Sequence, residues 1–112
     1  MKLLTKEVLD AFKKQGPCGE KKVADIKCIC KFFNPIGNSY WYCYEYEPKD
    51  RIFWAYVNLI GPDCAELGPV SLDELESIKL HFGMGIERDL GFPIGKYTMQ
   101  EIIDKVQKGE HV

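Results

Sequence analysis

The sequence lacks several features on which a functional assignment usually depends. Among its 112 residues there are only two histidines, His81 and His111, and no cysteines in C-x-x-C spacing. No apolar run approaches the roughly 20 residues of a membrane-spanning helix. Lysine and arginine number 15 against 17 acidic residues, so the chain has no basic excess of the kind that nucleic-acid-binding domains carry. These absences argue against the common zinc-site patterns, a membrane protein and a nucleic-acid-binding protein.

What the sequence does contain is typical of one soluble globular domain covering residues 1–112. Apolar residues make up 46% and charged residues 29% of the chain. A chain of this size buries about two-thirds of its surface, which is enough for a core without disulfide bonds. Residues 1–7 become charged too early for a secretory signal peptide, so we expect a cytoplasmic location. The five cysteines, an odd number, are then expected to be reduced thiols.

The periodicity of apolar residues predicts an α+β fold. Thr5 is a plausible N-cap, and Gly16 with Pro17 ends the first helical pattern. Two capping boxes of the form S/T-x-x-E mark the starts of two more helices. We expect N-terminal, middle and C-terminal helices packed on a mainly antiparallel sheet of three to four strands. The expected helices lie near residues 4–15, 72–80 and 98–108, and the expected strands near residues 23–33, 40–47, 52–60 and 66–70.

Aromatic residues are concentrated in the predicted sheet, where ten of the fourteen lie between residues 32 and 56. Strict alternation along residues 40–47 would give one face four tyrosines and the other face two glutamates. The tyrosine face is either part of the core or the lining of a half-open groove. The glutamates would repel phosphates, so nucleic acid is not an expected partner. The tyrosine face would carry Tyr40, Tyr42, Tyr44 and Tyr46, and the opposite face Trp41, Cys43, Glu45 and Glu47.

The first predicted strand, residues 23–33, is rich in cysteine. Alternation places Cys28 and Cys30 together on its apolar face and turns Lys31 toward water. We therefore expect both thiols to be buried, reduced and free of metal. A zinc site can be written from Cys18, Cys28, Cys30 and His81, but the spacing matches no known ligand pattern. We expect neither a metal ion nor a cofactor.

Several short motifs, in a fixed order over residues 3–92, resemble the bacterial family catalogued as domain of unknown function 2958. The resemblance implies an association with plasmids, integrated elements and phage, and it implies no established activity. Pro69-Val70 departs from the pattern, because aromatic residues usually follow the Glu-Leu-Gly motif, and the cysteine-rich strands are not part of it either. The motifs are Leu3-Leu4-Thr5-Lys6-Glu7, Lys31-Phe32-Phe33-Asn34-Pro35, Trp41-Tyr42 with Glu45, Glu66-Leu67-Gly68, Ser71-Leu72 with Glu74-Leu75, and Gly85-Ile86-Glu87-Arg88-Asp89-Leu90 with Phe92.

The candidate site centres on Arg88, one of only two arginines. If Ile86 and Leu90 are buried, extended alternation turns Arg88 inward, where its guanidinium would need a carboxylate such as Glu45 or Glu66. Such a pair is either a structural latch or the floor of a pocket for an anionic ligand. A third interpretation is a metal site built from carboxylates. Glu87 and Asp89 would then face outward. The candidate ligand-binding or partner-binding residues are Trp41, Tyr42, Glu45, Trp54, Glu66, Glu87, Arg88 and Asp89.

No residue of the sequence is assigned a catalytic role. No serine stands in a nucleophile-elbow motif, and His81 is expected at the end of a helix rather than as a base. Residues 40–91 carry four basic and ten acidic side chains, a net charge of −6 that suits docking on a basic surface. We therefore expect a small non-catalytic accessory protein of a mobile element or phage. It would bind a host protein or a small ligand, for example to inhibit a defence or replication factor. The alternative is a small enzyme that acts on a polar substrate in a pocket formed by Glu45 and Arg88.

Overall fold

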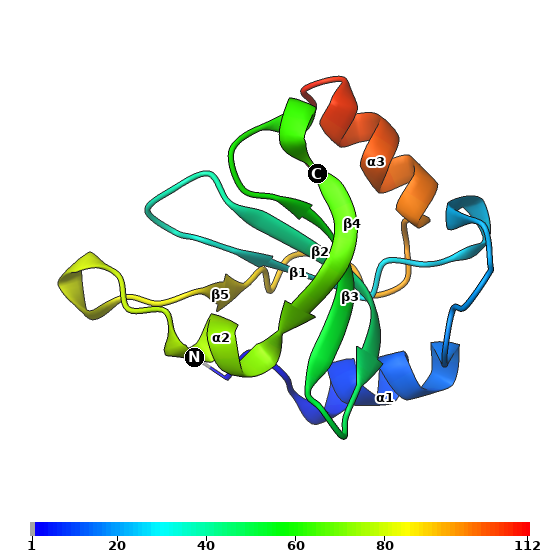
Figure 1. The fold of residues 1–112 in the computed structure, drawn as a ribbon, viewed down its shortest axis with the longest axis horizontal. Helices are drawn as coiled ribbons and strands as arrows, with labels where there is room; N and C mark the ends of the chain where they lie inside the picture. The colour runs from blue at the N-terminus through cyan, green and yellow to red at the C-terminus, as the bar shows by residue number, and fades with distance from the viewer. Residues whose placement is uncertain (1) are drawn as a thin grey trace.

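The computed structural model describes residues 2–112 and confirms the α+β class (Figure 1). Five antiparallel strands form one open sheet in the order β4-β3-β2-β1-β5. The sheet has one strand more than the upper limit of the prediction, because residues 87–88 pair with β1 and add an edge strand. The strands are β1 (Cys30–Phe33), β2 (Tyr40–Glu47), β3 (Ile52–Asn58), β4 (Glu66–Ser71) and β5 (Glu87–Arg88). The helices are α1 (Lys6–Gln15), α2 (Leu72–Ser77) and α3 (Met99–Gln107).

The helices begin where the caps predict. The Thr5 hydroxyl accepts from the Val8 amide at the start of α1, and the Ser71 hydroxyl caps α2 in the same way. Thr98 and Glu101 form a complete reciprocal capping box at the start of α3. The middle helix is shorter than predicted, because Ile78 adopts extended backbone angles and ends it after Ser77.

The sheet separates two apolar clusters, one on each of its faces. The α1 cluster lies under α1 and α2, and the α3 cluster lies under α3. Strand β3 has buried side chains in both clusters, as expected for a central strand with two apolar faces. The largest members of the α1 cluster are Phe12, Phe32, Trp41 and Phe53, and those of the α3 cluster are Tyr42, Tyr56, Phe92 and Met99.

A β-bulge in β2 breaks the predicted alternation of the tyrosines. Cys43 is the partner of Ala55 and Glu45 is the partner of Trp54, so Tyr44 is an extra residue in the ladder. After Tyr44, each side chain of β2 lies on the face opposite to the one that strict alternation predicts. Tyr46 consequently packs on Phe53 in the α1 cluster, with 4.7 Å between the ring centroids. The expected stripe of four tyrosines is therefore a stripe of three, and Glu45 lies on the α3 face beside Trp54.

The cysteine-rich segment forms a strand only from Cys30 onward. Val23–Asp25 is a single 3₁₀ turn, and Lys27 makes an isolated bridge to Thr98. As a result Cys28 lies in the α3 cluster and Cys30 in the α1 cluster, so the prediction of a shared face is wrong. Both thiols are buried and free, as predicted.

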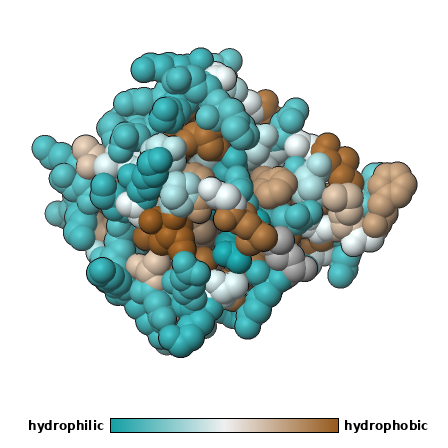
Figure 2. All heavy atoms as spheres, turned by 180° about the vertical axis from the view of Figure 1, so that it is seen from behind, coloured by the Kyte–Doolittle hydropathy of each residue, from teal (hydrophilic) through white to brown (hydrophobic). Residues whose placement is uncertain are grey.

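The loop between α2 and β5 projects from one end of the molecule (Figure 1). Figure 2 shows the molecule from behind, with apolar side chains gathered at the end where this loop lies. Within the loop, Phe82 is 95% exposed and has a φ of 63°. In residues 2–112 no helix has the length and apolar character that crossing a bilayer requires.

Two buried thiols make the stability of the fold sensitive to alkaline pH. Burial raises the pKa values of Cys28 and Cys43 well above their ordinary value of 9.0. Above about pH 9 the thiols of the unfolded chain lose protons while the native thiols keep them. The native state then binds more protons, so the free energy of unfolding falls as the pH rises, by up to about 1.4 kcal/mol per pH unit for each thiol.

Urea unfolding at several pH values between about 8 and 10 checks this prediction. We expect Cys28→Ala to reduce the fall in stability with pH. The control Cys64→Ala, at an exposed position, should leave the slope as in the parent. A slope that is the same in Cys28→Ala and in the parent would contradict the prediction.

Candidate functional site

The structure does not bring the eight predicted site residues into one constellation. Arg88 and Glu66 lie level with each other on one row of paired residues, but on opposite edge strands of the sheet. Four strand spacings separate them, or about 19 Å. An ion pair between these two residues is therefore excluded, and so is a metal site that includes Glu66 and Asp89, because Asp89 follows β5 directly.

Glu45 is also far from Arg88. Arg88 pairs with Phe32 of β1, which in turn pairs with Trp41 of β2. Glu45 lies four residues further along β2 than Trp41. The bulge also turns Glu45 to the α3 face, whereas Arg88 shares the face of its partner Phe32 in the α1 cluster. The predicted latch and the predicted enzyme pocket of Glu45 and Arg88 are both wrong. Arg88 instead lines a cavity of about 470 Å³ with Glu7 and Asp89.

The remaining predicted residues divide between core and surface. Trp41 and Tyr42 are buried on opposite faces of the sheet. Glu87 is the partner of Phe33 in the β1–β5 ladder. Leu90 is exposed, so the expected burial of both Ile86 and Leu90 holds only for Ile86.

Lys31 is a site residue that sequence reasoning misplaced. Alternation correctly puts it on the face opposite Phe32, but α3 and the segment 108–112 cover this face, and Lys31 is only 2% exposed. The Lys31 ammonium donates to the main-chain oxygen of Val112 over 2.6 Å. It also lies 3.6 Å from the carboxylate of Asp89, which was expected to face outward. The pairing of Lys31 with Tyr42 is set by the tertiary structure, so the sequence carries no local signal for the burial of Lys31.

Two aromatic rings complete the surroundings of the Lys31 ammonium. The ring centroids of Tyr40 and Tyr42 lie 5.0 Å and 5.8 Å from its nitrogen, within the range of cation–π attraction. Burial lowers the pKa of Lys31, and the charge of Asp89 partly offsets this effect. Burial raises the pKa of Tyr42, so its hydroxyl stays protonated and can donate.

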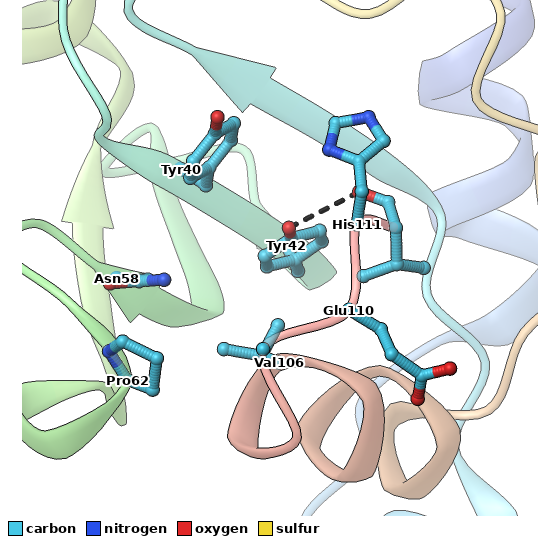
Figure 3. A pocket seen from close by; sticks show the side chains of 9 residues that line it. Tyr40, Tyr42, Asn58, Pro62, Val106, Glu110 and His111 are labelled. Carbon is cyan, nitrogen blue, oxygen red and sulfur yellow. Dashed lines mark hydrogen bonds between the residues drawn. The ribbon is translucent and has the colours of Figure 1, made fainter.

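A small cavity adjoins these groups; we call it the Tyr42 pocket (Figure 3). Its volume is about 210 Å³. The Tyr42 hydroxyl donates to the main-chain oxygen of Val112 over 3.2 Å, drawn as the dashed line in Figure 3. The Val112 oxygen therefore accepts from both Lys31 and Tyr42. The pocket is lined by Tyr40, Tyr42, Asn58, Pro62, Val106 and residues 109–112.

A larger hollow opens on the α3 face of the sheet; we call it the Trp54 groove. Its volume is about 430 Å³, and its lining includes Ile26, Tyr44, Glu45, Trp54 and Leu67. Trp54 is 39% exposed and Leu67 45% exposed. The Cys18 amide donates to the Glu45 carboxylate over 2.9 Å, which holds this charge at the groove.

The structure thus brings together two of the predicted residues, Trp54 and Glu45, at the Trp54 groove. Leu67 was missed as a member of a site, and Tyr44 was predicted only as part of a tyrosine face that could line a half-open groove. The bulge brings Glu45 to the same face as Tyr44, which strict alternation does not predict. The short apolar strand of Leu67 beside a tryptophan-bearing central strand was the available signal for the rest.

Comparison with known proteins gives a family and no described relative. A family model with the description "Protein of unknown function (DUF2958)" matches residues 3–112, which is almost the whole chain. No curated protein and no solved structure matches the chain.

Proposed function

We propose a function from the surface of the chain itself, because the chain belongs to the DUF2958 family and the description of that family assigns no activity. The proposal is a non-catalytic binding module that docks a partner protein in the Trp54 groove. The observation that carries it is the joint exposure of Trp54 and Leu67 in one hollow of about 430 Å³.

The composition of the groove supports a protein partner. Tryptophan and tyrosine are the residues most enriched among the binding hot spots of protein interfaces, and the groove holds one of each. Trp54 stands on β3, the strand between β2 and β4, so the sheet fixes its backbone. A rigid aromatic residue loses little conformational entropy when a partner covers it.

The charge at the groove indicates the chemistry of the partner. Glu45 offers a fixed carboxylate next to the apolar lining, and Lys21 lines the same hollow as its basic side chain. The partner segment should therefore present an apolar side chain to Trp54 and Leu67, a basic side chain to Glu45 and an acidic side chain to Lys21. Complementary charge of this kind acts mainly on the rate of association.

Addition of a partner strand to the neighbouring edge of β4 is less well supported. Pro69 lies within this six-residue strand and has no N–H to offer. Prolines in edge strands oppose pairing with other chains. The groove rather than the strand edge is thus the proposed docking surface.

The biological setting belongs to the same proposal. The family resemblance suggests a bacterial mobile element or phage, and the early charges of residues 1–7 suggest the cytoplasm. An accessory protein in this setting would act on a host protein, for example a defence or replication factor.

Replacement of Trp54 by alanine tests the proposal. Partners are first identified by mass spectrometry after capture on the parent chain, and their Kd values are then measured by calorimetry. We expect Trp54→Ala to raise the Kd at least about 30-fold, the effect of losing a hot spot worth about 2 kcal/mol. The control Ile60→Ala, at an 81% exposed position outside the groove, should change the Kd less than about threefold.

Glu45→Gln tests the charge separately. It should lower the association rate and reduce its dependence on salt. Equal Kd values for Trp54→Ala and the parent, with both variants folded, would refute the groove as the docking surface.

A further inference from the structure

The Tyr42 pocket shares no lining residue with the Trp54 groove. One of its lining residues, Val112, contacts Lys31, which is the most deeply buried charged side chain among residues 2–112. Burying an ammonium is costly unless nearby groups compensate for the lost water. Side chains alone do not fully compensate the Lys31 ammonium. Its nitrogen lies 3.6 Å from the Asp89 carboxylate oxygen, which is longer than an ordinary hydrogen bond. The short contact of Lys31 is made by the main-chain oxygen of Val112.

The hydrogen bonds of Lys31 and Tyr42 both end on the main-chain oxygen of Val112. An ammonium and a phenol hydroxyl converge on one oxygen, at 2.6 Å and 3.2 Å. The aliphatic side chain of Val112 meanwhile packs on the α3 cluster. The place that Val112 takes thus suits an oxygen acceptor joined to a small branched aliphatic group. An anionic oxygen would be held more tightly than a neutral one, because hydrogen bonds between charged groups are stronger.

The segment that fills the site is weakly attached to the rest of the fold. After α3 ends at Gln107, residues 107–111 are exposed, and Gly109 has a φ of 77° that releases the chain from the helical path. The Gly109 and Glu110 amides bond back to α3. Lifting Val112 out of the pocket would give up its two hydrogen bonds and a partly buried side chain.

We propose that the place taken by Val112, beside the Tyr42 pocket, is a binding site for a small branched aliphatic carboxylate, and that residues 109–112 fill this place as an internal competitor. The carboxylate accepts from Lys31 and Tyr42 in place of the Val112 oxygen, and its aliphatic group replaces the Val112 side chain. Ligand binding and docking of the segment exclude each other.

The test uses the full-length chain labelled with ¹⁵N and the probe N-acetyl-L-valine, titrated at constant pH and ionic strength. We expect saturable shifts of the amide signals around Lys31 and Tyr42, with a Kd on the order of 1 mM. The signals of Glu110 and His111 should move toward those of an unstructured peptide at the same probe concentrations. The neutral analogue N-acetyl-L-valinamide should bind at least tenfold more weakly.

Lys31→Met removes the ammonium and keeps the length of the side chain, and we expect it to weaken probe binding at least tenfold. The matched control Lys49→Met, at an exposed turn, should leave the Kd as in the parent. Tyr42→Phe removes one donor, keeps the ring and serves if Lys31→Met fails to fold; it should raise the Kd severalfold.

Three results would overturn the proposal. They are the absence of a saturable shift at ten times the expected Kd, equal binding of the acid and the neutral analogue, and probe binding that leaves the Glu110 and His111 signals unmoved.

Discussion

Replacing Phe53 with alanine should lower the free energy of unfolding by about 3–5 kcal/mol. The ring is fully buried on β3 and contacts three other rings of the α1 cluster, those of Phe12, Phe32 and Tyr46. Alanine would leave a cavity between the sheet and α1 that neighbouring rings fill only in part. Because domains of this size are stable by only about 5–15 kcal/mol, a large part of the stability would be lost.

Urea unfolding of Phe53→Ala and of the control Phe82→Ala measures this effect. Phe82 is the same residue type at 95% exposure, so its replacement should change the free energy of unfolding by less than about 0.5 kcal/mol. If both variants lost similar amounts, the assignment of Phe53 to the centre of the core would be wrong.

The second large effect is expected at Asp89. Asp89→Ala removes the carboxylate that faces the buried ammonium of Lys31 and leaves that charge less compensated. Removing one partner of a fully buried pair costs about 3–5 kcal/mol, but Asp89 is one-third exposed and the contact is long. Because solvent screens the exposed part of Asp89, we expect Asp89→Ala to lower the free energy of unfolding by about 2–3 kcal/mol.

The pH dependence of Asp89→Ala should change as well. The native pKa of Lys31, already lowered by burial, would fall further without the charge of Asp89. Between this lowered value and the ordinary value of 10.5, the unfolded chain binds the proton and the native chain does not. The free energy of unfolding of the variant should therefore rise with pH through this window more than that of the parent, once both are corrected for the thiols.

A double-mutant cycle with Lys31→Met separates the pair from its surroundings. The double variant should be more stable than Asp89→Ala, because no buried charge is left without its partner. The control Asp73→Ala breaks an exposed ion pair with Arg51 and should cost less than about 1 kcal/mol. A loss at Asp89 no larger than the loss at Asp73 would contradict the role of the buried pair.

The elements of the fold were largely predictable, because their signals are local. The caps Thr5, Ser71 and Thr98 act within one helical turn, and each begins a helix as predicted. Apolar side chains on both faces of residues 52–60 correctly predict a central strand, which the structure shows as β3. The added strand β5 was not predictable in the same way, since a strand of two residues has almost no pattern of its own and depends on its pairing with β1.

The candidate site was less predictable, because it depends on which face each side chain joins. One extra residue at Tyr44 reverses the faces of β2, and this separates Glu45 from the face of Arg88. For Lys31 the pattern gives the correct face, but not that α3 and residues 108–112 cover it. Both errors arise from tertiary structure that no window of the sequence contains.

The two edges of the sheet also bear on how the protein behaves at high concentration. An open sheet can recruit further copies edge to edge, which is the first step toward fibrils. Here β5 is too short to template such growth, and β4 interrupts its row of N–H donors at Pro69. Both edges of the sheet therefore resist edge-to-edge aggregation when the protein is concentrated.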